Sequence, residues 1–213
     1  MESLLDRLGD RGTWERFYGY KCSLACPKSF AAELRRFIDR EAYLPVAEGI
    51  HRGDPFPLPV KKSVAKLGTE RKRVVYTYPE PENTVLKLLT WLLLRRYDDR
   101  FSPGLYSFRP GRSAKDAIRT LRRTPGLGEM YAYKADIHDY FNSIPVPRLL
   151  PLLAETAGED PALLAFLLGC WRSRRPWRRA GPCGSRRASW RGPLFPPFTP
   201  TSTWRSWTGI FRS

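Results

Sequence analysis

The chain has 213 residues and carries 37 Lys and Arg against 21 Asp and Glu, which gives a formal net charge of +16 at pH 7. So large a positive charge favours a polyanionic partner, with nucleic acid ahead of an anionic membrane surface. No apolar run follows the N-terminus and the interrupted stretch 85–94 is too short to span a bilayer, so the sequence predicts a cytoplasmic protein without a signal peptide.

The charge is unevenly distributed along the chain. Residues 161–213 contain ten Arg and no Lys, Asp or Glu, so the first 160 residues carry 27 basic against 21 acidic side chains. Most of the basic excess therefore belongs to the C-terminal tail. The four cysteines, Cys22, Cys26, Cys170 and Cys183, lack the paired spacing of a zinc site, and we expect Cys22 and Cys26 to be ordinary reduced thiols.

Residues 1–57 form an N-terminal region that we expect to be largely helical. Within residues 28–40, Phe30, Leu34, Phe37 and Ile38 recur at the spacing of one helical face, which is typical of a packing helix. The alternating prolines of residues 54–59 predict an extended connector, because proline restricts both itself and the residue before it.

Residues 58–78 predict a β-hairpin with arms 59–66 and 71–78 and a turn at 67–70. Two interpretations stay open for its cationic side chains: a solvated edge that lysines protect from aggregation, or donors that neutralise phosphate oxygens. The six basic residues of the two arms are Lys61, Lys62, Lys66, Arg71, Lys72 and Arg73.

A helix is expected to begin near Glu80-Pro81, where proline suits the first turn, and to continue to about Arg96. The tripeptide 97–99, Tyr-Asp-Asp, ends this helix and is not interpreted as a metal-binding turn. Ser113 is placed to cap a further helix. Arg109 and Arg112 precede that cap and could contact phosphates, although an equally good alternative is a structural Arg paired with Asp116.

Residues 124–128 predict a loop that leads into one buried central strand at 131–136. Asp136 ends this strand, and a carboxylate in such a position is costly unless it is paired or binds a metal. The alternative is an ordinary Asp that caps the next turn. The apolar patterns at 148–155 and 161–169 predict two further helices.

Two blocks of sequence resemble the reverse transcriptases of bacterial retroelements, the group II intron and retron kind. Residues 106–118, YSFRPGRSAKDAI, are similar to a block in the fingers of that family, and residues 136–144, DIHDYFNSI, to the first catalytic block of its palm. The resemblance covers residues 58–171. It implies an α+β fold: the fingers (58–128) and first part of the palm (129–171) of a right-hand polymerase, with an incomplete antiparallel palm sheet and packed helices.

The resemblance also implies roles for individual residues in RNA-templated DNA synthesis from dNTPs with Mg²⁺. Asp136 is the catalytic carboxylate and metal ligand, and the backbone carbonyl of Ile137 is a second ligand. Phe141 lies under the sugar and excludes a 2′-hydroxyl. Lys66 and Arg73, and Lys62 less securely, bind the triphosphate. Arg109 and Arg112 lie along the template. The implied partners are an RNA template, a DNA primer and a dNTP; the oligomeric state is not indicated.

The tail, residues 172–213, does not match the family. It has four of the seven Trp, no carboxylate and no sustained period, and the family's Tyr-x-Asp-Asp block is missing after Asp136. In a reading frame shifted by one base, with permissible codons, residues 189–211 can be read as MAGTPLSPFYANLYLAELDRYF, which resembles the family's next block. We therefore expect a frameshift near Trp171 and a chain without polymerase activity of its own. The alternative is a non-enzymatic RNA-binding protein that uses the basic hairpin and an Arg- and Trp-rich tail.

Overall fold

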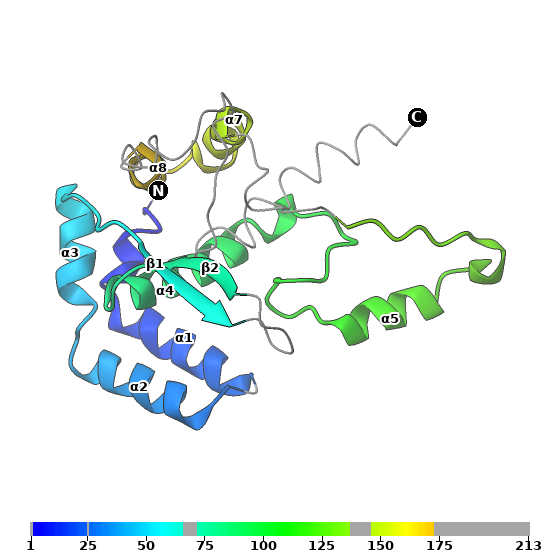
Figure 1. The fold of residues 1–213 in the computed structure, drawn as a ribbon, viewed down its shortest axis with the longest axis horizontal. Coiled ribbons are helices and arrows are strands. Elements are labelled where there is room, and N and C mark those ends of the chain that lie inside the picture. The colour runs from blue at the N-terminus through cyan, green and yellow to red at the C-terminus, as the bar shows by residue number, and fades with distance from the viewer. Residues whose placement is uncertain (1, 25, 66–71, 137–145, 173–213) are drawn as a thin grey trace.

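The structure is a computed structural model that describes residues 2–24, 26–65, 72–136 and 146–172 (Figure 1). Within these residues the fold is α+β, with a body of helices and one small antiparallel sheet. The elements in chain order are η1 (Asp6–Leu8), α1 (Arg11–Ser23), α2 (Lys28–Asp39), α3 (Leu44–Arg52), β1 (Val60–Ala65), β2 (Lys72–Thr77), α4 (Glu82–Arg96), η2 (Asp98–Arg100), α5 (Ala114–Arg122), η3 (Leu127–Glu129), α7 (Val146–Ala157) and α8 (Pro161–Arg172).

Helix α4 is the centre of the hydrophobic core. Its apolar residues surround the whole helix, as expected for a helix enclosed on all sides, and it packs against α1, α3 and η1. The predicted start and end of this helix are confirmed to within two residues. Its buried side chains are Val85, Leu86, Leu88, Leu89, Trp91, Leu92, Leu93 and Leu94.

The N-terminal helices pack on α4 through aromatic rings. Trp14 on α1 is fully buried, stacks on Tyr43 with ring centroids 4.9 Å apart, and donates its indole N–H to the carbonyl of Leu8 at 2.8 Å. The amphipathic helix predicted at 28–40 is confirmed as α2, with Leu34 and Ile38 buried. Phe37 of α2 contacts the rings of both Trp14 and Tyr43, so α2 covers one side of this aromatic cluster of Trp14, Phe37 and Tyr43.

The predicted hairpin is confirmed in its two arms. Strands β1 and β2 are antiparallel, in a register that pairs Val60 with Thr77 and Ala65 with Lys72. The predicted turn at 67–70 lies outside the described residues. Tyr78, just after β2, is buried and meets Phe56 of the extended connector, whose ring also contacts Phe166 of α8 at 5.3 Å. The hairpin is therefore fastened to the core at its base.

Helices α7 and α8 confirm the two helices expected after residue 146, and Asp160 joins α8 to the N-terminus of the chain. Its carboxylate accepts hydrogen bonds from the Ser3 hydroxyl at 2.7 Å, the Leu4 amide at 2.8 Å and the Leu163 amide at 3.1 Å. The last of these bonds caps α8. Asp160 thus connects the start of α8 to Ser3 and Leu4, which lie more than 150 residues away in the chain.

The central strand predicted at 131–136 is wrong. These residues form no strand and are exposed, with Tyr131 and Tyr133 almost fully accessible. A strand needs a hydrogen-bonding partner, and the two strands in the described part of the chain pair only with each other. Residues 131–136 instead run back from the tip of an arm, built by α5 and η3, that projects from the helical body (Figure 1).

Cys22 and Cys26 are free thiols, as predicted, and Cys183 lies outside the described residues. Among the helices that the structure describes, none is both long and apolar enough to cross a membrane.

Candidate nucleic-acid interface

The basic hairpin offers exposed cations at its described end. Lys61 and Lys62 on β1 are solvent-exposed, and no carboxylate of the described residues forms an ion pair with either ammonium group. Lys66 lies outside the described residues, and Arg73 is placed only as a backbone position of β2, paired with Val64. Of the predicted triphosphate ligands, Lys62 is thus the one whose side chain the structure shows, and it is free to meet an anion.

Arg109 is buried and fully engaged in structure. Its guanidinium donates to both carboxylate oxygens of Asp98 at 2.8 Å and to the carbonyls of Asp98 and Ser102 at 3.0 Å. It also lies over the ring of Phe101. The structural alternative predicted Asp116 as partner; the partner is Asp98, which immediately follows α4. Arg109 therefore fastens the loop before α5 to the end of α4.

The contact between Arg109 and Asp98 gives the tripeptide at 97–99, Tyr-Asp-Asp, a structural role at the end of α4. Tyr97 caps the end of α4, as predicted, and Asp98 accepts from Arg109, which holds the pKa of that carboxyl below its usual value against the opposing effect of burial. Asp99 lies 3.9 Å from Arg100. Both carboxylates thus have arginine partners in the fold.

Arg112 and Ser113 prepare the start of α5. Arg112 is exposed, donates to the carbonyl of Pro103 at 2.9 Å and lies over the ring of Tyr106. The predicted cap is confirmed: Ser113 and Asp116 form a reciprocal capping box, and Arg119 in turn pairs with Asp116 at 2.9 Å. Because its remaining N–H groups face solvent, Arg112 can still contact a phosphate, whereas Arg109 is enclosed.

Asp136 is exposed at the end of the described arm, and within the described residues it forms no ion pair with a hairpin cation. Mg²⁺ is held by carboxylates together with substrate phosphates. Within the described residues no group of three or more Asp, Glu, His or Cys side chains is arranged so that it could hold a metal ion, and Ile137 and Phe141 lie outside those residues. A single exposed carboxylate does not fit a two-metal site.

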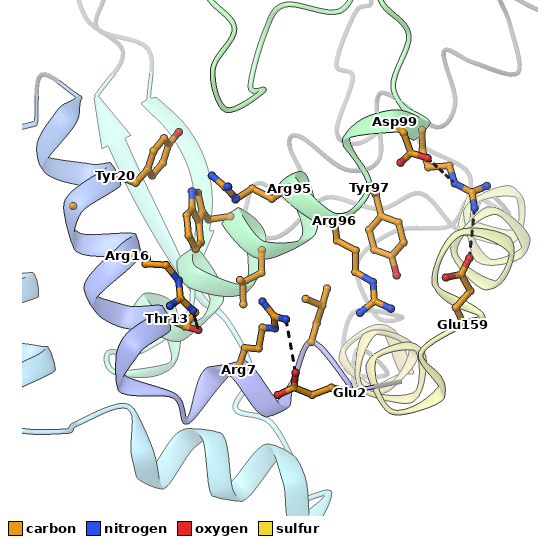
Figure 2. A pocket seen from close by; sticks show the side chains of 15 residues that line it. Glu2, Arg7, Thr13, Arg16, Tyr20, Arg95, Arg96, Tyr97, Asp99 and Glu159 are labelled. Carbon is orange, nitrogen blue, oxygen red and sulfur yellow. Dashed lines mark hydrogen bonds and ion pairs between the residues drawn. The ribbon is translucent and has the colours of Figure 1, made fainter.

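A basic groove, which we define by Arg7, Arg16, Arg95, Arg96 and Arg100, lies between α1, the C-terminal part of α4 and the loop before α8 (Figure 2). Its volume is about 940 Å³, at the upper end of the size of ligand sites. Three acidic residues, Glu2, Asp99 and Glu159, also line it. Arginine residues thus outnumber carboxylates in the basic groove.

The arginines of the basic groove differ in how firmly they are held. Arg96 is mostly buried and lies 3.6 Å from Asp160, a structural position. Arg7 meets Glu2 at 3.7 Å, and both side chains are well exposed, so this ion pair is weak. Arg95 is exposed, lies over the Trp91 ring at 5.0 Å, and has no carboxylate at ion-pair distance within the described residues.

None of the residues of the basic groove was singled out from the sequence. The signal available was weak: Arg95 and Arg96 end an apolar helix, where basic side chains are common for helix-dipole reasons alone. Arg7 and Arg16 lie some 80 residues away in the chain, and no local period connects them to α4. Only the packing of α1 on α4 brings these guanidinium groups around one hollow.

No protein-family model matches the chain, and no curated protein matches it at a significant level. Function is therefore inferred from the residues of the chain itself.

Proposed function

We propose that residues 58–171 are the fingers and the first part of the palm of a retroelement-type reverse transcriptase, a family that copies RNA into DNA from dNTPs. The observation that carries the proposal is the pair of blocks at 106–118 and 136–144, in the order and at the spacing of that family. Two long blocks in order are far more specific than a single short motif.

Features of the fold support the first block as a structural unit. Arg109 is enclosed by the end of α4, and Ser113 caps α5 through a capping box. Gly111 between them has φ +76°, a backbone conformation that favours glycine. Three residues of the block thus have physical reasons for their identity, as expected of a loop that holds α5 at a set angle to α4. The hairpin with exposed Lys61 and Lys62 supports a surface for phosphates.

We infer that the 213-residue chain does not polymerise DNA. Two-metal nucleotidyl transfer needs several carboxylates, and no Asp or Glu follows Asp160 in the sequence. The assay is incorporation of labelled dNTP on a primed RNA template by the purified chain. Incorporation above background that disappears in Asp136→Ala would contradict this inference.

The frameshift is tested directly on the encoding DNA. Resequencing across the codons for Leu168 to Arg187, and reading on in the shifted frame, should reveal a Tyr-x-Asp-Asp block followed by further coding sequence. A protein expressed from the repaired frame should incorporate dNTPs, and Asp136→Ala should abolish that activity. Stop codons soon after the shift in both alternative frames would refute the frameshift and, with it, the assignment of the tail.

The second candidate is a non-enzymatic RNA-binding protein, favoured by the exposed lysines of β1 and by the basic groove. Deletion of residues 173–213, which leaves α8 intact, separates the two candidates. A functional tail predicts a large loss of salt-dependent RNA affinity on deletion. A frameshifted tail predicts better solubility and unchanged preference among RNA sequences.

A further inference from the structure

We propose that the basic groove binds the sugar–phosphate backbone of a single nucleic-acid strand, as a contact separate from the hairpin and from Asp136. The identification of that strand as RNA rests on the proposed function. The site itself rests on the charge, shape and backbone of α1 and α4.

The charge of the basic groove is available to a ligand. The groove contains no hydrogen-bonded ion pair between Arg7 and Glu2 or between Arg100 and Glu159, because these pairs are separated by 3.7 and 3.6 Å. Phosphate oxygens can therefore replace these carboxylates at small cost. Arg16 donates through one nitrogen to Thr13 at 2.8 Å and, more weakly, to Asp10 at 3.5 Å, and its well-exposed side chain keeps its other N–H groups for a ligand. Guanidinium groups bind phosphate in a two-pronged geometry.

Arg95 is the best placed donor. Its guanidinium lies over Trp91, and the Trp91 ring in turn contacts Tyr20 at 5.8 Å. Holding the side chain against an aromatic surface reduces the entropy that it loses when it binds an anion. With no carboxylate of the described residues at ion-pair distance, Arg95 keeps its N–H groups for a partner outside the chain.

Gly19 is an independent indication of a close partner. It lies in the interior of α1, where glycine destabilises a helix by about 1 kcal/mol relative to alanine, and it lines the basic groove. A Cβ added at Gly19 would meet no atom of the chain within 4 Å, so internal packing gives no reason for glycine here. A strand lying against α1 does give one, because its backbone can approach glycine more closely than any other residue.

The shape of the basic groove favours a strand over a flat anionic surface. Its lining comes from three separate parts of the chain, and Figure 2 shows Arg7, Arg95 and Arg96 placed around the hollow. A planar membrane reaches only the rim of such a concavity. An extended strand can enter it and meet Arg7, Arg16 and Arg95 in turn.

The test is a fluorescence anisotropy titration of the full chain with labelled single-stranded RNA, and with DNA of the same sequence, at several salt concentrations. Arg16→Gln with Arg95→Gln removes two charges from the basic groove. The matched control is Arg36→Gln with Arg40→Gln. Arg36 lies on α2 and Arg40 directly follows it; both side chains are exposed, and neither forms an ion pair within the described residues. Both variants keep the tail and the same net charge.

The groove variant should weaken RNA binding about tenfold or more relative to the control and lower the salt slope by about two. Gly19→Ala, which changes no charge, should raise the thermal midpoint and weaken RNA binding. Its control is Gly169→Ala in α8, where an added Cβ also meets no atom within 4 Å; this variant should leave RNA affinity unchanged. Equal binding of DNA would support a backbone site that does not distinguish the two sugars.

Equal affinities for the groove variant and its charge control would overturn the inference. Lys61→Gln with Lys62→Gln on β1 separates that failure from failure of the proposed function. If the hairpin variant loses affinity and the groove variant does not, the groove inference fails while the hairpin contact remains. If neither the groove variant nor the hairpin variant loses affinity relative to the control, neither surface binds RNA, and both the groove inference and the proposed phosphate-binding role of the hairpin fail.

Discussion

Replacing Asp160 by alanine should destabilise the whole helical body. The Asp160 side chain is buried and connects Ser3 and Leu4 to the first turn of α8, while Arg96 from α4 lies 3.6 Å from the same carboxylate. One residue thus holds three parts of the chain that are distant in sequence. Its removal leaves the buried Leu4 amide without an acceptor, α8 without its N-cap and Arg96 without its counter-charge.

The size of the effect follows from these losses. Loss of an N-cap costs about 1 kcal/mol, and each buried donor left without an acceptor costs about 1–3 kcal/mol. Because the Ser3 hydroxyl is only partly buried and can turn to water, we expect a total of about 3 kcal/mol, the lower end for breaking a buried ion pair. For a chain of this length that corresponds to a fall of about 6–12 °C in thermal midpoint.

Asp160→Asn tests whether charge or shape matters. In the wild type one carboxylate oxygen accepts from Ser3 and Leu163 and the other from Leu4. Asparagine keeps one acceptor but turns an amide NH₂ toward the second set of donors, including Arg96. We therefore expect a loss of stability that is smaller than that of Asp160→Ala and still clearly measurable.

The pH dependence of stability gives an independent check on Asp160. Burial alone would raise its pKa, but the hydrogen bonds from Leu4, Ser3 and Leu163 and the charge of Arg96 outweigh it and hold the pKa below the usual value. A carboxyl with a lowered folded pKa stabilises the fold above its unfolded pKa of about 3.9 and loses that contribution as pH falls through the folded pKa. The stability difference between wild type and Asp160→Asn should therefore be constant from pH 5 to 8 and shrink below about pH 4.

The assay is urea unfolding followed by circular dichroism and by tryptophan fluorescence. The control is Asp99→Ala, an exposed carboxylate whose nearest partner is 3.9 Å away, and its midpoint should equal that of the wild type. If Asp160→Ala shifts the midpoint no more than this control, or if its difference from the wild type persists unchanged at pH 3, the reasoning is refuted.

Three further substitutions test other contacts. Arg109→Ala should cost about 1–3 kcal/mol, because it removes a buried donor from the carbonyls of Asp98 and Ser102 and from the half-exposed Asp98 carboxylate; urea unfolding measures the loss, and rapid hydrogen exchange confined to residues 98–112 should accompany it. Gly158→Ala should lower the thermal midpoint, because its Cβ would lie 2.6 Å from the carbonyl oxygen of Ala154; a midpoint at or above wild type would contradict the geometry. Trp14→Ala should cost about 3–5 kcal/mol by emptying the aromatic cluster, measured by calorimetry, and a loss below 1 kcal/mol would show that the cluster repacks.

Several elements could be predicted from the sequence because their signals are local. The spacing of Leu34 and Ile38 defines one face of α2, and Ser113 caps α5 through contacts within three residues. The hairpin likewise depends on two short strands that lie close together in the sequence. Such interactions connect residues three or four positions apart, or adjacent arms, so the pattern alone determines them.

Other features were decided only by tertiary structure. Asp98 and not Asp116 pairs with Arg109, since the end of α4 returns to the loop before α5. Residues 131–136 have the composition of a buried strand, yet they are exposed because a strand acquires its structure from a partner, and the described residues supply none. The basic groove joins Arg16 to Arg95 only when α1 packs on α4. Burial and pairing depend on segments far apart in the chain, and no local pattern carries that information.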